Sequence, residues 1–577
     1  MTGNDAARDA GAGRWAVEAL LCAFVAAAAP LPFAARRPFG LGDEGFLFLL
    51  SQGWAAGEPL FSRYHLLYPT GQYSFYGALM RLFGDSMLVL RCGHALLGGV
   101  AAALLLLAAR RAGAGPALAA ALAAAATCAG AKPVSLVAAA PVVLAAVDLA
   151  VRRIPPRPWV VAVATCAGGL VPFREDSAIL LLGVAVVAVG LRRRAVEVAT
   201  VILPGLTLGF SPWLLLELVR GAGDPLAFTA LCARRVLFLG GRLGDPTEVA
   251  WLWPPRIPAD AVELATMAIP FLVVLLPLFY ATLLAGQWWR QRRGEAVRPH
   301  LVAAGLLGFA YLPQFAWERP DLPHLRTHLP ILAAVVVLAA ARAPLVHRLA
   351  AGLLVAVLTA VPLLATLRAQ TPPTRIYPCC QGARVGARLH GAPPWAGLPR
   401  RPGETLIVLG WSPGWYVLEG IKPGSRHLST FPRHLPSAAD HARLLDDLAR
   451  PANRWVISPG GPALPVPDEA ERLVARLYRL EHRWRGYELW QRRRHGEVSR
   501  APRSDAARVV VSQASSSHSR ADASRQSRVV CAFGYPADPF AARADNERYT
   551  PAGYGKGQIP CLLMLLGHNR TLDRSMP

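Results

Sequence analysis

The sequence predicts a polytopic α-helical membrane protein with about 11 transmembrane helices and a small C-terminal α/β domain outside the cytoplasm. Three observations predict this class. Hydrophobic residues make up 53% of the 577 residues and charged residues only 17%, which is too apolar for one soluble domain of this length. Apolar runs of roughly 20 residues, the length that crosses a bilayer, recur along the first part of the chain. Arginine clusters follow every second run, as expected of cytoplasmic loops.

The basic charge does not predict a nucleic-acid-binding protein. The formal net charge is +24, and nearly all of it is arginine, because the only lysines are Lys132, Lys422 and Lys556. These groups form short clusters between apolar runs, whereas a nucleic-acid surface needs one basic patch with interleaved aromatic residues. The nine cysteines show no Cys/His spacing typical of a zinc site. We therefore expect neither nucleic acid nor a cysteine-bound metal.

The apolar runs define a membrane domain over residues 1–369. They lie at residues 14–35, 86–109, 114–131, 133–151, 158–173, 176–191, 195–219, 262–286, 300–316, 329–342 and 349–368. The first run begins close to the N-terminus and could be a signal peptide. It has no convincing small-residue cleavage site, so we interpret it as a retained anchor.

The arginine clusters predict the orientation of this domain. They are Arg110-Arg111, Arg152-Arg153-Arg157, Arg192-Arg193-Arg194, Arg290-Arg292-Arg293 and Arg342-Arg348. Short cytoplasmic loops retain arginine, so the clusters place these loops inside. This orientation places loops 36–85 and 220–261, and everything after residue 368, on the extracytoplasmic side. We therefore expect a multi-pass protein of the cell's inner (plasma) membrane. Arg36-Arg37 is an exception that the larger clusters outweigh.

The first outer loop reads GDEGFLFLLSQGWAAGEPLFSRYHLLYPTGQYSFYGALMRLFGDS. The run from Phe46 to Trp54 predicts a short helix in the membrane interface, where aromatic residues are favoured. A second helix is expected from Gly71 to Phe83. Asp43 and Glu44 open this apolar segment, and acidic residues favour helix N-termini. Their position alone therefore leaves a structural and a functional interpretation open.

Several of these segments resemble the GT-C glycosyltransferases of the protein-mannosyltransferase and aminoarabinose-transferase type. The GDEG run, the GEPLF turn and LLYPTGQYSFYGALMRLFG are similar to that family's first outer loop. PDLPHLRTHLP, just before a span, resembles a later outer loop, and the soluble domain closes with YELWQRR. The resemblance covers roughly residues 14–492. It implies transfer of a sugar from a polyprenyl-phosphate donor to a glycan, lipid or protein acceptor of the cell envelope, with inversion.

The resemblance also assigns roles to the two acidic residues. It implies that Asp43 is the catalytic base and that Glu44 supports it or binds the acceptor. The leaving phosphate is already a stable anion, so the reaction needs a base for the acceptor hydroxyl and cations for the phosphate. The aminoarabinose enzymes place a lysine before the proline of this loop, whereas Tyr68 precedes Pro69 here. The phosphate ligand and the donor therefore stay open.

Arginine suits a phosphate because its planar fork donates two hydrogen bonds. The candidates for binding the donor phosphate or substrate are Arg63, Tyr64, His65, Tyr68, Arg81, Arg91, Arg174, His324 and Arg326. Most outer arginines face lipid headgroups, and Arg174 could be neutralised within its own Arg174-Glu175-Asp176 turn. Arg91 lies at span depth, which is typical of a functional group, yet it could equally pair with a carboxylate such as Glu217. No metal ligands can be assigned, and a divalent cation as cofactor stays open.

The chain after the last span predicts an α/β domain over residues 370–495. β-like runs at Thr405–Leu409, Trp455–Ser458 and Tyr487–Gln491 alternate with helical runs at Ala438–Ala449 and Asp468–Leu480. The tail, residues 496–577, is rich in Ser and Arg, which predicts disorder.

Two other functions compete with glycosyl transfer. A multi-pass transporter would carry ionisable groups near mid-membrane and interrupted helices, and Pro204 and Pro212 interrupt one span. A non-catalytic membrane scaffold would need no acidic outer loop.

Overall fold

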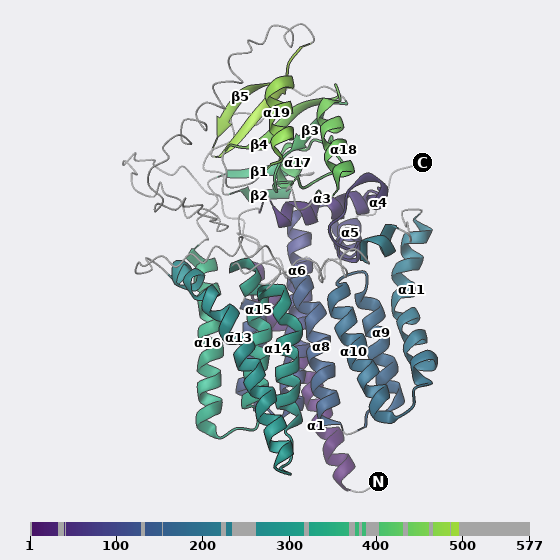
Figure 1. The fold of residues 1–577 in the computed structure, drawn as a ribbon, viewed down its shortest axis with the longest axis vertical. Helices are drawn as coiled ribbons and strands as arrows, with labels where there is room; N and C mark the ends of the chain where they lie inside the picture. The colour runs from purple at the N-terminus through teal and green to yellow at the C-terminus, as the bar shows by residue number, and fades with distance from the viewer. Residues whose placement is uncertain are drawn as a thin grey trace, which may run out of the picture. The chain divides into compact units, whose positions relative to one another are not determined.

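The computed structural model describes most of the chain up to residue 494. The described residues are 3–32, 40, 42–128, 133–152, 154–220, 227–232, 261–316, 322–368, 375–379, 383–387, 403–430, 435, 437–460, 466–484 and 486–494. All of them belong to the first of the two units into which the chain divides, Met1–Cys531. This part is mostly helical, with a small β-sheet near its C-terminal end (Figure 1).

A helix lies at each of the predicted apolar runs. These helices are α1 (Gly3–Ala28), α6 (Met87–Ala112), α7 (Pro116–Cys128), α8 (Pro133–Val151), α9 (Arg157–Leu170), α10 (Glu175–Arg192), α11 (Leu203–Val219), α13 (Ala261–Arg292), α14 (Pro299–Ala316), α15 (Leu322–Ala340) and α16 (Leu345–Arg368). A π-helical turn, η1 (Val198–Ile202), leads into α11. Among the described residues, three helical segments are long and apolar enough to cross a membrane: Met87–Ala112, Val134–Val151 and Val198–Val219. They support association with a membrane, while eleven crossings stay a prediction.

Small residues bring these helices close together. Helix α6 packs against α1, α7 and α8, and Ala101, Ala102 and Leu105 are fully buried there. Gly168 on α9 and Gly209 on α11 lie so close to the opposite backbone that a side chain has no room. Small residues allow this approach in lipid, where apolar burial alone does not drive helices together.

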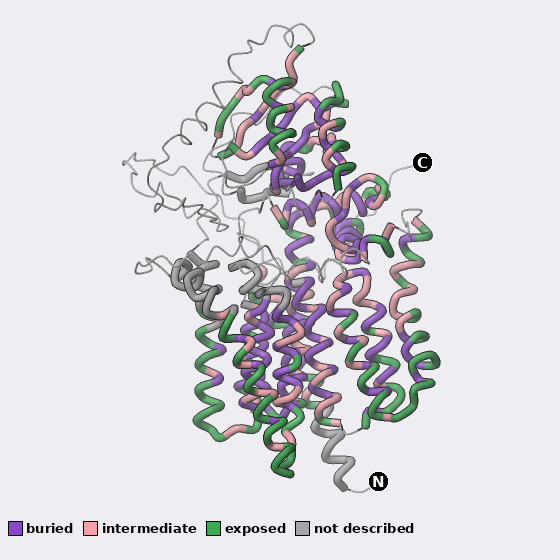
Figure 2. The backbone as a smooth tube through the Cα atoms, in the orientation of Figure 1, coloured by how far each residue is buried: buried purple, intermediate pink, exposed green. Residues whose placement is uncertain are grey.

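Exposed residues recur along several long helices (Figure 2), and many of them are large apolar residues. Leu208 and Leu215 on α11 are 61% and 63% exposed, and Leu349 and Leu353 on α16 are 64% and 68% exposed. Extensive apolar surface on a folded chain marks a site of contact with membrane or protein. On helices of this length it is the expected surface of a lipid-facing bundle.

The first outer loop folds into α3 (Asp43–Ala55), α4 (Leu60–Arg63) and α5 (Gly71–Phe83). The bounds predicted for the second helix are confirmed, and the first begins at Asp43, three residues before the predicted Phe46. Helix α3 packs on α5, where an added Cβ on Gly77 would meet the Trp54 ring and the Ser51 carbonyl. Phe46, Trp54 and Tyr73 are buried at this contact.

Residues 403–494, called here the C-terminal α/β region, contain a four-stranded sheet. Its order is β3-β4-β6-β5, with β3 (Thr405–Val408), β4 (Asn453–Pro459), β5 (Tyr478–Trp484) and β6 (Tyr487–Arg492). Strands β3 and β4 run parallel, and β6 is antiparallel to both of its neighbours. The helices are α17 (Gly414–Glu419), α18 (Ala438–Ala449) and α19 (Asp468–Leu477). A hairpin of β1 (Arg375–Cys379) and β2 (Ala383–Ala387) precedes this region.

One predicted boundary in this region is wrong. The helix predicted over Asp468–Leu480 ends at Leu477, and β5 begins at Tyr478. The buried Tyr478 hydroxyl donates to the carbonyls of Leu448 and Asn453, each at 2.9 Å, and β5 pairs with β6. These long-range contacts outweigh the helical pattern of the sequence.

Other predictions lie wholly or partly outside the described residues. Within the predicted outer loop 220–261, only residues 220, 227–232 and 261 are described, and residues 227–232 are helical. The predicted disordered tail, residues 496–577, lies outside.

Candidate functional site

Asp43 stands in the first turn of α3 and is exposed. Its Oδ1 accepts a hydrogen bond of 3.1 Å from the indole Nε1 of Trp411. Trp411 also packs on Phe46, with ring centroids 5.1 Å apart, and lies against Gly42, where an added Cβ would be 2.9 Å from the indole. The carboxylate is therefore oriented by a residue of the C-terminal α/β region while it faces solvent.

Glu44 has very different surroundings. Its Oε1 accepts from Arg91 Nε at 2.8 Å, and its Oε2 accepts from Arg91 Nη2 at 3.1 Å. The backbone N–H of Gly40 donates to Oε2 at 2.8 Å. Arg91, on α6, is 5% exposed and the Glu44 side chain is 12% exposed, so this is a largely buried, two-pronged ion pair. It fixes the start of α3 on α6.

Glu217, the partner suggested for Arg91, lies near the end of α11 and is 2% exposed. Trp54 Nε1 donates to it at 3.0 Å and Ser74 Oγ at 2.8 Å. These donors come from α3 and α5. The structure thus pairs Arg91 with Glu44 and ties Glu217 to both helices of the first outer loop.

Arg63 and Tyr64 share a carboxylate and line a small polar cavity. Arg63 forms an ion pair with Glu58, and the Tyr64 hydroxyl donates to Glu58 at 3.1 Å. Burial, and then the Glu58 charge, raise the pKa of Tyr64 well above its ordinary value, so the phenol stays a neutral donor. The cavity, of about 230 Å³, is also lined by Pro423, Gly424, Ser425, Arg426, Asp447 and Arg450.

Arg174 is held in the short turn between α9 and α10. Its Nε donates to Asp176 Oδ1 at 3.2 Å and its Nη1 to Ser135 Oγ at 2.8 Å. The side chain is 16% exposed, and it interacts electrostatically with Tyr68. This arrangement agrees with a turn whose charges compensate each other. The first outer loop reaches the same turn, since the Gly71 N–H donates to the Pro172 carbonyl at 2.7 Å.

The remaining candidates lie apart. Arg81 is exposed at the end of α5. His324 and Arg326 are in α15, and their side chains lie outside the described residues. His65 contacts the C-terminal α/β region: its N–H donates to the Arg426 carbonyl at 2.8 Å, and its Nδ1 is 3.9 Å from Asp440 Oδ1.

The structure therefore brings the candidates together in small groups. Glu44 and Arg91 form one, beside Asp43 in the first turn of α3, and Arg63 and Tyr64 form another. Sequence reasoning missed Glu58, Trp411, His427 and Asp440. No local signal points to Trp411, because it is 368 residues from the carboxylate that it contacts.

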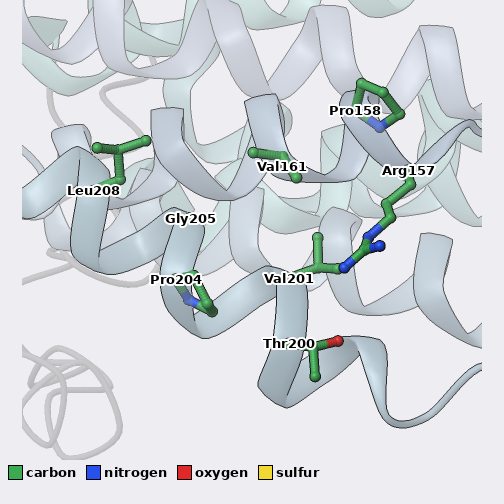
Figure 3. Close-up of a pocket in the computed structure, with 8 residues that line it drawn as sticks. All are labelled: Arg157, Pro158, Val161, Thr200, Val201, Pro204, Gly205 and Leu208. Atoms are coloured by element: carbon green, nitrogen blue, oxygen red, sulfur yellow. The ribbon is translucent and has the colours of Figure 1, made fainter.

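A larger cavity lies between α9 and α11 (Figure 3). Its volume is about 430 Å³, and Arg157, Val161, Thr200, Gly205 and Leu208 are among the lining residues. Arg157 is the one charged residue of that lining, and no carboxylate is present in it. Asp43 lines neither this cavity nor the one beside Tyr64. The chemistry expected of a base with a bound phosphate does not fit here.

Comparison with known proteins adds no assignment: no protein-family model matches the chain, and the curated proteins searched contain no match to it.

Proposed function

We propose that this protein is a membrane glycosyltransferase that takes a sugar from a polyprenyl-phosphate donor and passes it to an acceptor of the cell envelope. The observation that carries the proposal is that two adjacent carboxylates have different surroundings. Glu44 is committed to the buried Arg91, whereas Asp43 is exposed and oriented by Trp411. An oriented, solvent-facing carboxylate is what a general base requires.

The proposed reaction is a single displacement. An acceptor hydroxyl attacks the anomeric carbon, its proton passes to Asp43, and the bond from that carbon to the phosphate oxygen breaks. The phosphate leaves as an anion, so no strong acid is needed on that side, and the anomeric centre is inverted. Glu44 and Arg91 hold the first turn of α3 in position. The active site and the C-terminal α/β region are proposed to face the extracytoplasmic side of the inner membrane.

The surface of the bundle supports the proposed lipid-linked donor. The exposed apolar faces of α11 and α16 suit contact with membrane lipid and a polyprenyl chain. The acceptor can be a glycan, a lipid or a protein. Among the candidates for the donor phosphate, Arg63 and Arg174 are already paired with carboxylates. The donor phosphate must therefore displace those carboxylates from the arginines, or it must be bound by other residues of the outer loops.

The test is transfer by purified full-length protein in lipid vesicles, supplied with radiolabelled polyprenyl-phosphate sugars and extracted envelope acceptors. Asp43→Asn keeps the size of the side chain and removes the base, so we expect transfer to fall about 10²- to 10⁴-fold, with donor binding unchanged. Asp446→Asn, an exposed carboxamide replacement on α18, is the matched control and should keep full transfer.

Full transfer by Asp43→Asn would overturn the base assignment. Failure of the unaltered protein to transfer from any polyprenyl-phosphate sugar would overturn the enzymatic proposal, and solute uptake into the same vesicles would then favour the transporter. Glu217 argues against transport, because this buried carboxylate is tied to the outer-loop helices α3 and α5.

A further inference from the structure

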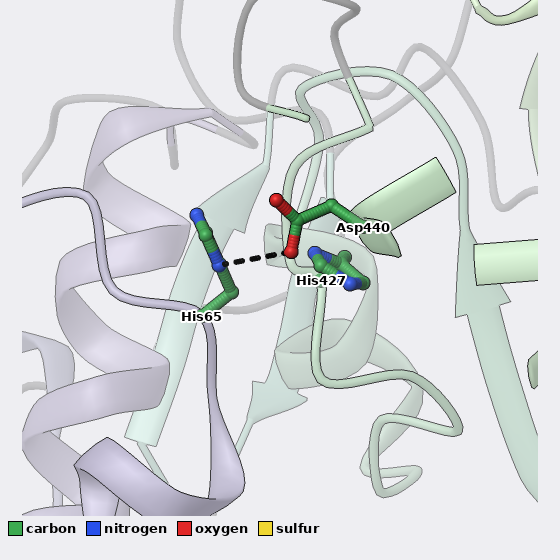
Figure 4. Close-up of side chains that lie close together, drawn as sticks. All are labelled: His65, His427 and Asp440. Atoms are coloured by element: carbon green, nitrogen blue, oxygen red, sulfur yellow. Dashed lines mark ion pairs between the residues drawn. The ribbon is translucent and has the colours of Figure 1, made fainter. Parts of the chain in front are cut away.

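Three potential metal ligands from distant parts of the chain meet where the first outer loop contacts the C-terminal α/β region (Figure 4). His65 lies between α4 and α5, His427 between α17 and α18, and Asp440 in the first turn of α18. One ligand atom from each lies within 4.8 Å of the others. The two imidazole rings are 5.2 Å apart, centroid to centroid.

His427 is the least expected member of this group. It is 1% exposed, and neither of its ring nitrogens has a hydrogen-bond partner among the described residues. Leaving a buried polar group unsatisfied costs on the order of 1–3 kcal/mol, and such groups are rare enough to require an explanation.

Asp440 is held so that one oxygen remains directed at the histidines. The Ser437 hydroxyl donates to its Oδ2 at 2.7 Å and accepts from the Asp440 N–H at 3.1 Å. This reciprocal cap fixes the carboxylate, and Oδ1 is the atom that faces His65. Two acidic residues, Asp440 and Asp447, and two basic residues, Arg426 and Arg443, contribute the charge around His427. They balance in sign, so they do not by themselves repel a cation.

We propose that His65, His427 and Asp440 bind one divalent transition-metal ion, for which Zn²⁺ is the best match. Two imidazoles and a carboxylate suit zinc better than magnesium or calcium, which prefer oxygen ligands. Tetrahedral zinc, with bonds of about 2.0–2.2 Å, places its ligand atoms roughly 3.4 Å apart. The present spacing therefore requires side-chain shifts of the order of 1 Å.

The ion would join two segments that are already in contact. The His65 N–H to Arg426 carbonyl bond crosses the same contact, and zinc would add a stronger link beside it. His65 and Asp440 are 13% and 11% exposed, so an ion has access from solvent, and water can take the fourth position. The metal would have a structural role, because it would link the first outer loop to the C-terminal α/β region. The proposal goes beyond glycosyl transfer, since no step of that reaction uses the metal.

Zinc binding by the full-length protein in detergent is the first measurement. Protein stripped with a chelator is titrated with Zn²⁺ against a fluorescent competing chelator. We expect one ion per chain, and at least a tenfold loss of affinity in His427→Ala, in His65→Ala and in Asp440→Asn, because each removes one of three ligands. Millimolar Ca²⁺ should not compete.

The matched controls are His482→Ala and Asp446→Asn, which alter exposed residues of the same region. Both should bind Zn²⁺ like the unaltered protein. Size-exclusion elution and the thermal midpoint establish that each variant is folded, and the partly exposed His65 provides a ligand variant if His427→Ala is unstable. Absence of zinc binding, or equal binding by the ligand variants and controls, would overturn the proposal.

Hydrogen exchange supplies a second readout. Zinc should slow exchange of the His65 amide, which donates across the contact, in the unaltered protein and not in Asp440→Asn. An unchanged exchange rate of this amide would refute the proposed structural role of the metal. Neither measurement uses glycosyl transfer: a chain that transfers sugar but binds no zinc removes only this inference, and a chain that binds zinc but transfers nothing removes only the proposed function.

Discussion

At the scale of single residues, Asp43 and Glu44 show how neighbours in sequence acquire different chemistry. Successive residues of a helix point about 100° apart, so one carboxylate turns toward α6 and the other toward solvent. Arg91 neutralises the first, and Trp411 contacts the second. The acidic pair was open to a capping or a catalytic interpretation, and the structure gives the two members separate surroundings.

The Arg91–Glu44 pair leads to a prediction about stability. Arg91→Met leaves Glu44 buried without its cation, and breaking one partner of a buried pair costs about 3–5 kcal/mol. We expect a clearly lower thermal midpoint in detergent. The double variant Glu44→Gln/Arg91→Met should recover part of that loss, because no uncompensated charge remains.

The matched control is Arg483→Ala on β5, whose partner is Glu488 and whose side chain is 74% exposed. An exposed pair contributes about 0–1 kcal/mol, so the midpoint should barely move. If Arg91→Met behaved like this control, the buried pair would not hold α3 in place.

At the scale of elements, the position of α3 depends on close backbone contacts. Helix α3 packs on α5 and on α17 of the C-terminal α/β region. At Gly45 an added Cβ would overlap the backbone of Gly414, at the start of α17. Glycine is needed here for space, since two main chains approach with no side chain between them.

Gly45→Ala is therefore expected to push α3 away from α17. Overpacking costs about 1–3 kcal/mol, and the same displacement should weaken the Trp411–Asp43 contact and lower transfer. Gly98→Ala on α6 is the control, because nothing lies within 4 Å of its added Cβ. Replacing a helix-interior glycine by alanine is favourable by about 0.5–1 kcal/mol, so its thermal midpoint should stay or rise. Equal midpoints for the two variants would contradict the close-contact argument.

The sequence predicts elements better than it predicts their contacts. Gly71–Phe83 and Ala438–Ala449 are recovered with the same bounds, because their helical periodicity is a local property. Strand β5 was missed, because its pairing with β6 is not visible in the local pattern. The same reason applies to the candidate site: Asp43 can be selected from its own loop, but Trp411, His427 and Asp440 meet that loop only after folding.

At the scale of the whole molecule, helices coincide with the predicted apolar runs and carry exposed apolar faces. These observations support association with a membrane. The orientation still rests on the arginine clusters alone, and the positive-inside rule makes it testable.

Fusions of alkaline phosphatase test that orientation, because this reporter forms its disulfides and its activity only outside the cytoplasm. A fusion after residue 368 or after residue 494 should be active. A fusion after Arg193, in a predicted cytoplasmic loop, should be inactive, and a fluorescent protein that folds in the cytosol should show the reverse pattern. An active phosphatase after Arg193 would contradict the predicted topology.

The contact between Trp411 and Asp43 also has a consequence for biogenesis. At about 5–20 residues per second of translation, the indole emerges roughly 20 to 70 seconds after the carboxylate that it orients, since 368 positions separate them. During that interval α3 can pack on α5, but its apolar residues lack the later contacts with α17 and Trp411. A nascent chain arrested before residue 403 would thus leave apolar residues of α3 exposed and depend on chaperones, and the contact between Trp411 and Asp43 would be among the last features to form.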